Sequence, residues 1–278
     1  SHAASFAQLV YVSSWIKRHY PAAFACALLN SQPMGFYAPA QIVRDAREHG
    51  VEMRPVDVSY SGWDNSLEGS DRTPALRIGL RQIEGFREDW AEALAAARAF
   101  SLSNIETLAR RAALSSAAMR KLADADALRS LRLDRREALW AVRRLPDDAP
   151  LPLFAAADAR ELGAEPDARL PVMPLGEHVA ADYQTLRLSL KAHPMAILRP
   201  IFEAEGLLNC AQTDARRGGA LVRVAGVVLV RQRPGKGNAI FVTLEDETGI
   251  INVVLWARMF EQFRREVMAA RLMAVEGV

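Results

Sequence analysis

The clearest strand pattern in the chain is LVRVAGVVLVRQRPGKGNAIFVTLEDETGIINVVLW, residues 221–256, and the fold expected for the last part of the chain rests on it. Two apolar runs flank a turn at Pro234–Gly237, and Thr248-Gly249 turns the chain into a third run. Within NAIFVTLEDE, one set of side chains alternates with another at the period of a half-buried strand: Ile240, Val242 and Leu244 against Phe241, Thr243 and Glu245. The stretch therefore predicts three consecutive strands joined by tight turns.

A helix and a fourth strand are predicted after these runs, over residues 257–269 and 271–278. The order strand–strand–strand–helix–strand is typical of an OB-fold, a small Greek-key barrel closed by a fifth strand. Because the chain ends before a fifth strand, we expect an OB-fold that lacks its last strand, cut from a longer protein. Gly226, inside the first run, indicates a bend or bulge.

The Gly235-Lys236-Gly237 turn has two readings, a phosphate-binding loop or a hairpin that holds nucleic acid. A P-loop needs GxxxxGK[ST] between a strand and a helix, whereas Asn238 and a strand follow here. We therefore predict a hairpin beside a single-strand-binding face, on which Phe241 offers a stacking surface. The cations that would attract the nucleic-acid backbone are Arg231, Arg233 and Lys236. A flexible surface hairpin is the alternative.

The first two-thirds of the chain is mainly helical by pattern, with short strands and turns over residues 51–75. Helices are expected over 5–20, from Pro21 to Asn30, over 39–49 and, with short loops, from 76 to about 145, where the N-caps are Ser103, Ser115 and Asp134. Residues 146–175 hold six of the fourteen prolines and predict an extended connector before a helical pair, 176–191 and 194–205. The fold class is therefore multidomain α+β.

Composition narrows the function classes. The 278 residues carry a net charge of +2, and no apolar run approaches the roughly 20 residues that span a bilayer. No signal peptide is recognisable, and Cys26 and Cys210 have no metal-ligand spacing, so a cytoplasmic protein without a metal site is expected. Arginine pairs recur along the chain, which is typical either of solvated helix faces or of phosphate binding.

GLRQIEGFREDWAEAL, residues 79–94, is similar to a helix-hairpin-helix element, in which backbone N–H groups after a glycine turn bind a DNA phosphate. The usual turn has two glycines around one apolar residue, whereas Gly85-Phe86-Arg87 keeps only the first. We predict DNA contact at these three residues. A helix-ending role for Gly85 is the alternative.

The order of segments resembles bacterial C-family DNA polymerases of the polymerase III alpha-subunit type. Residues 1–58 resemble the end of the fingers region, and NSQPMGFY, LRIGLRQIEGF and LDRREALWAVRRL are most similar to the error-prone branch. The resemblance implies a fingers end (1–75), tandem helix-hairpin-helix elements that bind duplex (76–145), a connector (146–218) and an OB-fold near the single-stranded template (219–278).

The resemblance also implies that the metal-binding carboxylates lie in a palm outside this chain, so no catalytic residue and no cofactor are expected here, and Mg²⁺ belongs to the missing palm. The chain alone is expected to be inactive. His2 is a candidate nucleotide contact. The acidic pairs Asp147-Asp148 and Asp246-Glu247 are predicted to be solvated loop charges, and His193 to be a capping or packing residue.

One connector segment, Pro150-Leu151-Pro152-Leu153-Phe154, resembles the sliding-clamp docking peptide Gln-Leu-x-Leu-Phe. Proline replaces the glutamine that supplies hydrogen bonds, so clamp docking through Leu151, Leu153 and Phe154 has an alternative, anchoring in the protein's own core.

The functional hypothesis is the DNA-binding portion of an error-prone, translesion DNA-directed DNA polymerase that is induced by DNA damage. It would grip primer–template duplex and single-stranded template. The alternative is a scaffold that docks translesion partners or the sliding clamp and has little affinity for DNA.

Overall fold

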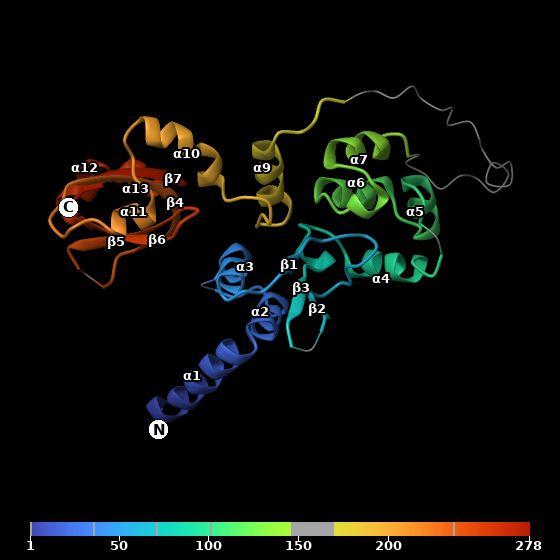
Figure 1. Ribbon diagram of the computed structural model, residues 1–278, viewed down its shortest axis with the longest axis horizontal. Coiled ribbons are helices and arrows are strands. Elements are labelled where there is room, and N and C mark those ends of the chain that lie inside the picture. Colours follow the sequence, from blue (N-terminus) through green and yellow to red (C-terminus); the bar gives the residue numbers. More distant parts are fainter. Residues whose placement is uncertain (1, 36, 71, 101, 146–169, 236) are drawn as a thin grey trace. The chain divides into compact units, whose positions relative to one another are not determined.

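The computed structural model describes every residue except 1, 36, 71, 101, 146–169 and 236. The chain forms two compact units, residues 1–190 and 191–278. Mainly helical structure fills the first unit and a curled antiparallel sheet dominates the second (Figure 1), which confirms the predicted α+β class. No helix in the described parts of the chain is long and apolar enough to cross a membrane.

Three helices open the first unit: α1 (His2–His19), α2 (Pro21–Asn30) and α3 (Pro39–Glu48). Proline at the first position of α2 and α3 suits a helix start, because its missing N–H would have no partner there. α2 and α3 bury one face each, whereas α1 has no buried residue. The predicted positions of these helices are confirmed.

A three-stranded sheet follows, with β3 (Pro74–Arg77) between β1 (Met53–Arg54) and β2 (Ser66–Gly69). β1 runs parallel to β3 and β2 antiparallel to it. The prediction of helix from residue 76 is wrong, because Leu76 and Arg77 pair in this sheet and only a 3₁₀ turn, η1 (Leu80–Gln82), follows. Gly79 lies directly before this turn, and a Cβ there would overlap backbone atoms of Trp63 and Asp64.

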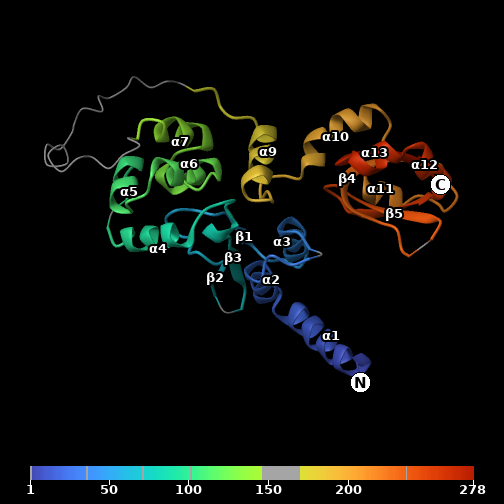
Figure 2. The ribbon, with the colours of Figure 1, turned by 180° about the vertical axis from the view of Figure 1, so that it is seen from behind.

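Helices α4 (Glu88–Ala97), α5 (Ile105–Arg111), α6 (Ser116–Asp124) and α7 (Arg135–Val142) lie together in both views (Figures 1 and 2), with a second 3₁₀ turn, η2 (Arg129–Leu131), before α7. Ser115 and Asp134 cap α6 and α7 as predicted. The cap of α5 is Asn104 rather than Ser103, since the Asn104 side chain accepts the Thr107 N–H at 2.8 Å.

Helix α9 (Leu175–Thr185) completes the first unit and is shorter than the predicted helix over 176–191. A buried ion pair joins it to α7, between Arg135 and Asp182, which are 1% and 2% exposed. The Arg135 guanidinium also donates to the His178 carbonyl at 2.8 Å. Because an unpaired buried charge is costly, this contact fixes α9 against α7.

The second unit contains α10 (Pro194–Ala204), the unpredicted short helix α11 (Cys210–Asp214) and a four-stranded antiparallel sheet in the order β6-β5-β4-β7. The strands are β4 (Val222–Gln232), β5 (Ala239–Glu245), β6 (Ile250–Trp256) and β7 (Leu272–Gly277). The predicted helix between β6 and β7 is two short helices, α12 (Ala257–Gln262) and α13 (Arg264–Ala269).

The sheet has an inward face that forms the core of this unit. Ile240, Val242 and Leu244 of β5 pack there with Val267 and Met273. The expected irregularity in β4 falls at Val228–Val230, where the register with β5 shifts. Gly226 instead permits close approach, since a Cβ there would lie 2.9 Å from the Glu245 carbonyl oxygen.

Candidate nucleic-acid interface

The Gly85 turn is tied to other parts of the first unit. Gly85 has φ +68°, which suits glycine. The neighbouring Glu84 N–H donates to the Thr185 carbonyl at 2.8 Å, and the Lys121 ammonium donates to the Glu84 carbonyl at 2.9 Å. A Cβ at Gly85 would lie 2.9 Å from Lys121 Nζ. The turn therefore serves as a docking point for α6 and α9.

The two residues after Gly85 also have partners inside the chain. Phe86 is a core residue, only 6% exposed, with its ring centroid 5.4 Å from that of Trp90. Arg87 lies over Trp90 and pairs with Asp89 at 2.6 Å (Nη2–Oδ2). Glu88 and Asp89 make the first turn of α4 acidic, which disfavours a phosphate at this helix start. Burial removes Phe86 from the surface that could contact DNA.

A second hairpin, between α5 and α6, was not singled out from the sequence. Ala112 and Leu114 are buried on either side of Ala113, which is exposed and has φ +47°. Ser115 then caps α6, accepting the Ala118 N–H at 3.3 Å, and the first turn of α6 carries no acidic residue. A helix-hairpin-helix turn is usually recognised by a glycine at the left-handed position, and here that position is alanine. The sequence pattern that could have identified the hairpin is the apolar–small–apolar triplet Ala112–Leu114 followed by the N-cap Ser115.

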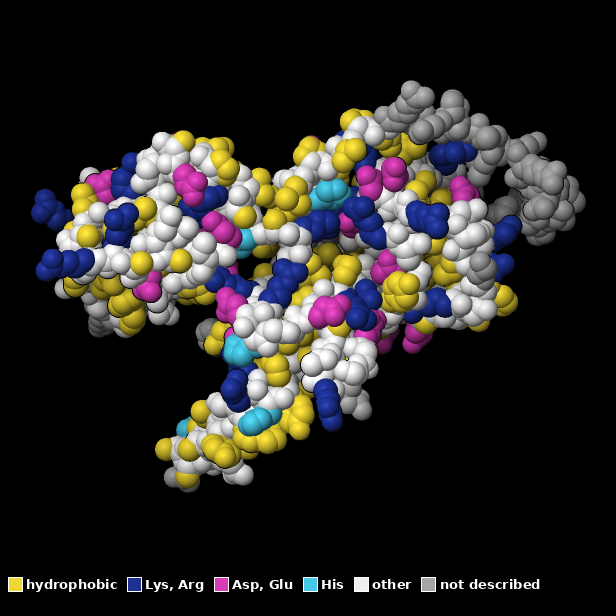
Figure 3. All heavy atoms as spheres, viewed as in Figure 1, with side chains coloured by type: hydrophobic (Ala, Val, Ile, Leu, Met, Phe, Trp, Pro, Cys, Tyr) yellow, Lys and Arg dark blue, Asp and Glu magenta, His cyan; other side chains and the backbone are white. Residues whose placement is uncertain are grey.

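The electrostatics of the α5–α6 hairpin differ from those of the Gly85 turn. Arg110 and Arg120 are exposed on the helices that flank it. A helix N-terminus without acidic residues and with neighbouring cations is the arrangement that favours phosphate oxygens. Across the rest of the visible face of this unit, Lys and Arg side chains are interspersed with acidic ones (Figure 3). The α5–α6 hairpin is therefore the better candidate for a DNA backbone contact.

In the second unit, Phe241 lies on the outward face of β5, because its neighbours Ile240 and Val242 are buried in the inward core. Its predicted position opposite those two residues agrees with the structure. Phe241 pairs with Gln232 of β4 and Val254 of β6. Trp256 lies in register with the same outward side, is 65% exposed and was not predicted as a site residue. The alternation in IINVVLW was the signal that could have found it.

The three predicted cations of the hairpin do not form one cluster. Arg231 pairs with Val242, and its Nε donates to the Val267 carbonyl at the end of α13, so its guanidinium supports the inward core. Arg233 is exposed, with its Nε 3.0 Å from the Gly237 carbonyl oxygen. Lys236 lies outside the described residues. Of the two that the structure describes, Arg233 is the exposed one, and its contact with nucleic acid stays a prediction.

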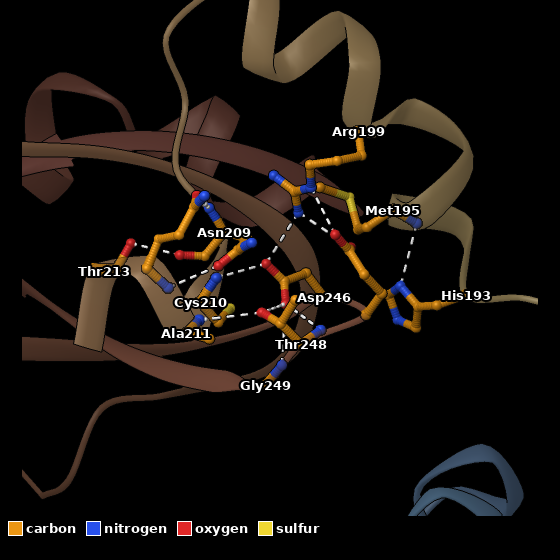
Figure 4. A network of polar contacts seen from close by, with 12 residues as sticks. His193, Met195, Arg199, Asn209, Cys210, Ala211, Thr213, Asp246, Thr248 and Gly249 are labelled. Carbon is orange, nitrogen blue, oxygen red and sulfur yellow. Dashed lines mark hydrogen bonds and ion pairs between the residues drawn. The ribbon is translucent and has the colours of Figure 1, made fainter. Parts of the chain in front are cut away.

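Helices α10 and α11 are held against the sheet by a polar network around Asp246 (Figure 4). Arg199 of α10 points toward the β5–β6 turn and donates to Asp246 at 3.0 Å and Glu247 at 2.6 Å. Burial acts to raise the pKa of Asp246, but hydrogen bonds from Thr248 and from the Cys210 N–H outweigh it and lower that pKa. The prediction that Asp246-Glu247 is a solvated pair is wrong, since Asp246 is 1% exposed.

The remaining predicted residues lie at helix starts or outside the described residues. His193 caps α10, its Nδ1 accepting the Met195 N–H at 3.1 Å, which confirms the capping prediction. His2 is the first residue of α1, and its ring centroid lies 4.8 Å from that of Phe6. Leu151, Leu153, Phe154 and the Asp147-Asp148 pair lie outside the described residues. Within the described ranges, no group of three or more His, Cys, Asp or Glu could hold a metal ion.

Two motif families match the chain where these hairpins and strands lie. A helix-hairpin-helix motif covers residues 50–138, and an OB-fold nucleic acid binding domain covers residues 222–278. Over 299 residues the chain is 58% identical to a protein named error-prone DNA polymerase from Rhodopseudomonas palustris (strain BisA53), covering 100% of this chain and 26% of that protein. The chain is a homologue of one part of the error-prone DNA polymerases.

Two other proteins named error-prone DNA polymerase are similar to the chain over its whole length. The protein of that name from Brucella abortus biovar 1 (strain 9-941) is 58% identical over 279 residues, covering 100% of this chain and 26% of that protein. The one from Bradyrhizobium diazoefficiens is 51% identical over 331 residues, covering 100% and 29%. The chain spans about a quarter of the length of these error-prone polymerases. The family resemblance and the helix-hairpin-helix and OB-fold predictions are thereby confirmed.

Proposed function

We propose that this chain is the DNA-binding portion of an error-prone, translesion DNA-directed DNA polymerase, and that it grips primer–template duplex and single-stranded template. The observation that carries the proposal is the succession of a helix-hairpin-helix motif and an OB-fold nucleic acid binding domain in a chain aligned throughout with error-prone polymerases. In this proposal, the carboxylates and Mg²⁺ that drive nucleotide transfer belong to the rest of the polymerase.

In this proposal, the α5–α6 hairpin contacts the duplex. The N–H groups at the start of α6 and the exposed Arg110 and Arg120 would meet phosphate oxygens, which fixes the position of the duplex without reading its sequence. The Gly85 turn is less suited to this role, because its backbone bonds to α9 and Lys121 and because α4 starts with two acidic residues.

The test measures fluorescence anisotropy of labelled primer–template duplex with the full chain over a range of NaCl concentrations. The double variant R110Q/R120Q should weaken binding and flatten the plot of log Kobs against log [NaCl] by about 1.8, since each lost duplex phosphate contact removes about 0.9 from the slope. The matched control R87Q, in which the removed cation already has an intramolecular partner, should leave the slope unchanged.

Two results would contradict the proposal. A greater loss with R87Q than with R110Q/R120Q would move the duplex contact to the Gly85 turn. Negligible affinity of the wild-type chain for both duplex and single strands at low salt would reject a DNA-binding role and favour the scaffold that docks translesion proteins or the sliding clamp.

A further inference from the structure

The outward face of the second unit's sheet is divided into a covered half and an open half. Ala225 and Val227 of β4 lie in the covered half, where they pack with Met195 and Phe202 of α10. Beyond the bulge at Val228–Val230, the outward side chains of Val230, Val254 and Trp256 are 40%, 46% and 65% exposed. We call the uncovered part the open sheet face; the residues that form it are Val230, Gln232, Phe241, Thr243, Asn252, Val254 and Trp256.

The strand register sets two aromatic rings of the open sheet face at a useful spacing. Phe241 is directly opposite Val254, and Ala239 is directly opposite Trp256. Phe241 and Trp256 are therefore diagonal neighbours, whose side chains lie about 7–8 Å apart in an antiparallel pair. That is roughly twice the 3.4 Å rise between bases in a stacked strand. Successive bases of an unstacked single strand can each meet one ring.

The charge on the open sheet face is also informative. None of its residues is ionisable, and its central polar pair is neutral, with Thr243 Oγ1 donating to Asn252 Oδ1 at 2.8 Å. Among the described residues, two exposed cations follow the ends of its strands closely in sequence: Arg233 after β4, and Arg258, two residues beyond Trp256. The Ala257 N–H bonds to the Asn238 carbonyl at 2.7 Å, which places the start of α12 at the β4–β5 hairpin. An uncharged face with a cationic end suits the bases and the phosphates of one nucleic-acid strand.

We propose that Trp256 is the principal base-stacking residue of this unit and that single-stranded DNA is held here mainly by stacking, with little phosphate neutralisation. The inference rests on the proposed single-strand-binding function and assigns its chemistry to this face. Two phosphate contacts, at Arg233 and Arg258, would give a slope of log Kobs against log [NaCl] of about −1.4, because each contact contributes about −0.7 for single strands. Arg231 is excluded from the contact by its bond to the Val267 carbonyl.

The experiment measures the anisotropy of labelled oligo(dT) with the full chain between low and high NaCl. W256A should weaken binding roughly tenfold, the loss expected for one stacked base, by the same factor at every salt concentration. The plots for wild type and W256A should be parallel and shallow. W256F should retain most of the affinity. The matched control is W140A, which removes an exposed tryptophan of α7 from the other unit and should bind like wild type.

A second measurement uses the wild-type chain and so does not depend on the folding of any variant. Ultraviolet irradiation of a complex with 5-iodouracil-substituted oligo(dT) should give a cross-linked peptide that contains Trp256. Cross-linking confined to other peptides, or W256A binding equal to wild type, would overturn the inference and leave the proposed function standing. A steep salt slope for oligo(dT) would overturn the stacking mechanism. Absence of wild-type binding to any single strand would instead reject single-strand binding itself.

Discussion

Arg199 of α10 and Asp246 after β5 form an ion pair, with 3.0 Å between Nη2 and Oδ2, inside a site where both residues are less than one-tenth exposed. The same carboxylate accepts N–H groups from Cys210, Thr248 and Gly249 at 2.7–3.0 Å. One side chain thus holds α10, the start of α11 and the β5–β6 turn together. These contacts decide which half of the outward sheet face is covered.

Replacing Asp246 by asparagine should destabilise the second unit by about 3 kcal/mol, since the buried Arg199 guanidinium loses a charge partner and an amide cannot accept all these bonds. Urea-dependent labelling of Cys210, which is buried in wild type, reports the unfolding of this unit. The control E276Q removes the exposed partner of Arg223 and should cost less than about 1 kcal/mol. Equal midpoints for D246N and wild type would contradict the prediction.

The pH dependence of the D246N effect follows from the lowered pKa of Asp246. A carboxylate whose pKa is depressed by folding contributes stability above its unfolded pKa, about 3.9, and loses that contribution as pH falls through its folded pKa. The difference in unfolding free energy between wild type and D246N should therefore be constant from pH 7 to about 5 and shrink below about pH 4. Urea titrations of both proteins at each pH measure it; a difference that grows on acidification would refute the assignment.

Gly79→Ala should destabilise the first unit by several kcal/mol, because a Cβ would overlap backbone atoms of Trp63 and Asp64 that have no side-chain freedom to move. The matched control is Gly35→Ala, where nothing lies within 4 Å of an added Cβ. Thermal unfolding of the two variants provides the comparison. If they unfold at the same temperature, the close approach at Gly79 is not present in solution.

Ala113→Gly should stabilise the first unit by about 1 kcal/mol, since the left-handed conformation costs an L-residue roughly that much and costs glycine little. Ala117→Gly, inside α6, should destabilise it by a similar amount, because glycine is a poor helix former. Urea midpoints of opposite sign relative to wild type would bear this out. A loss of stability in A113G would show that the hairpin does not hold the left-handed turn.

Local sequence patterns were enough to predict the succession of strands and helix along the last 57 residues and the helix starts at Pro21, Pro39, Ser115 and Asp134. Alternation along β5 also determined that Phe241 faces away from Ile240 and Val242. These features depend on local periodicity and capping, which neighbouring residues set. The family resemblance added the order of the modules.

Which side chains remain accessible to a ligand depends on the tertiary fold. Phe86, Arg231 and Asp246 look available in the sequence, but distant segments bury the first and bind the other two. Trp256 and the α5–α6 hairpin became candidates for the opposite reason, because Trp256, Ala113, Arg110 and Arg120 are exposed. Burial and ion pairing between residues far apart in the chain depend on packing, which local sequence patterns do not encode.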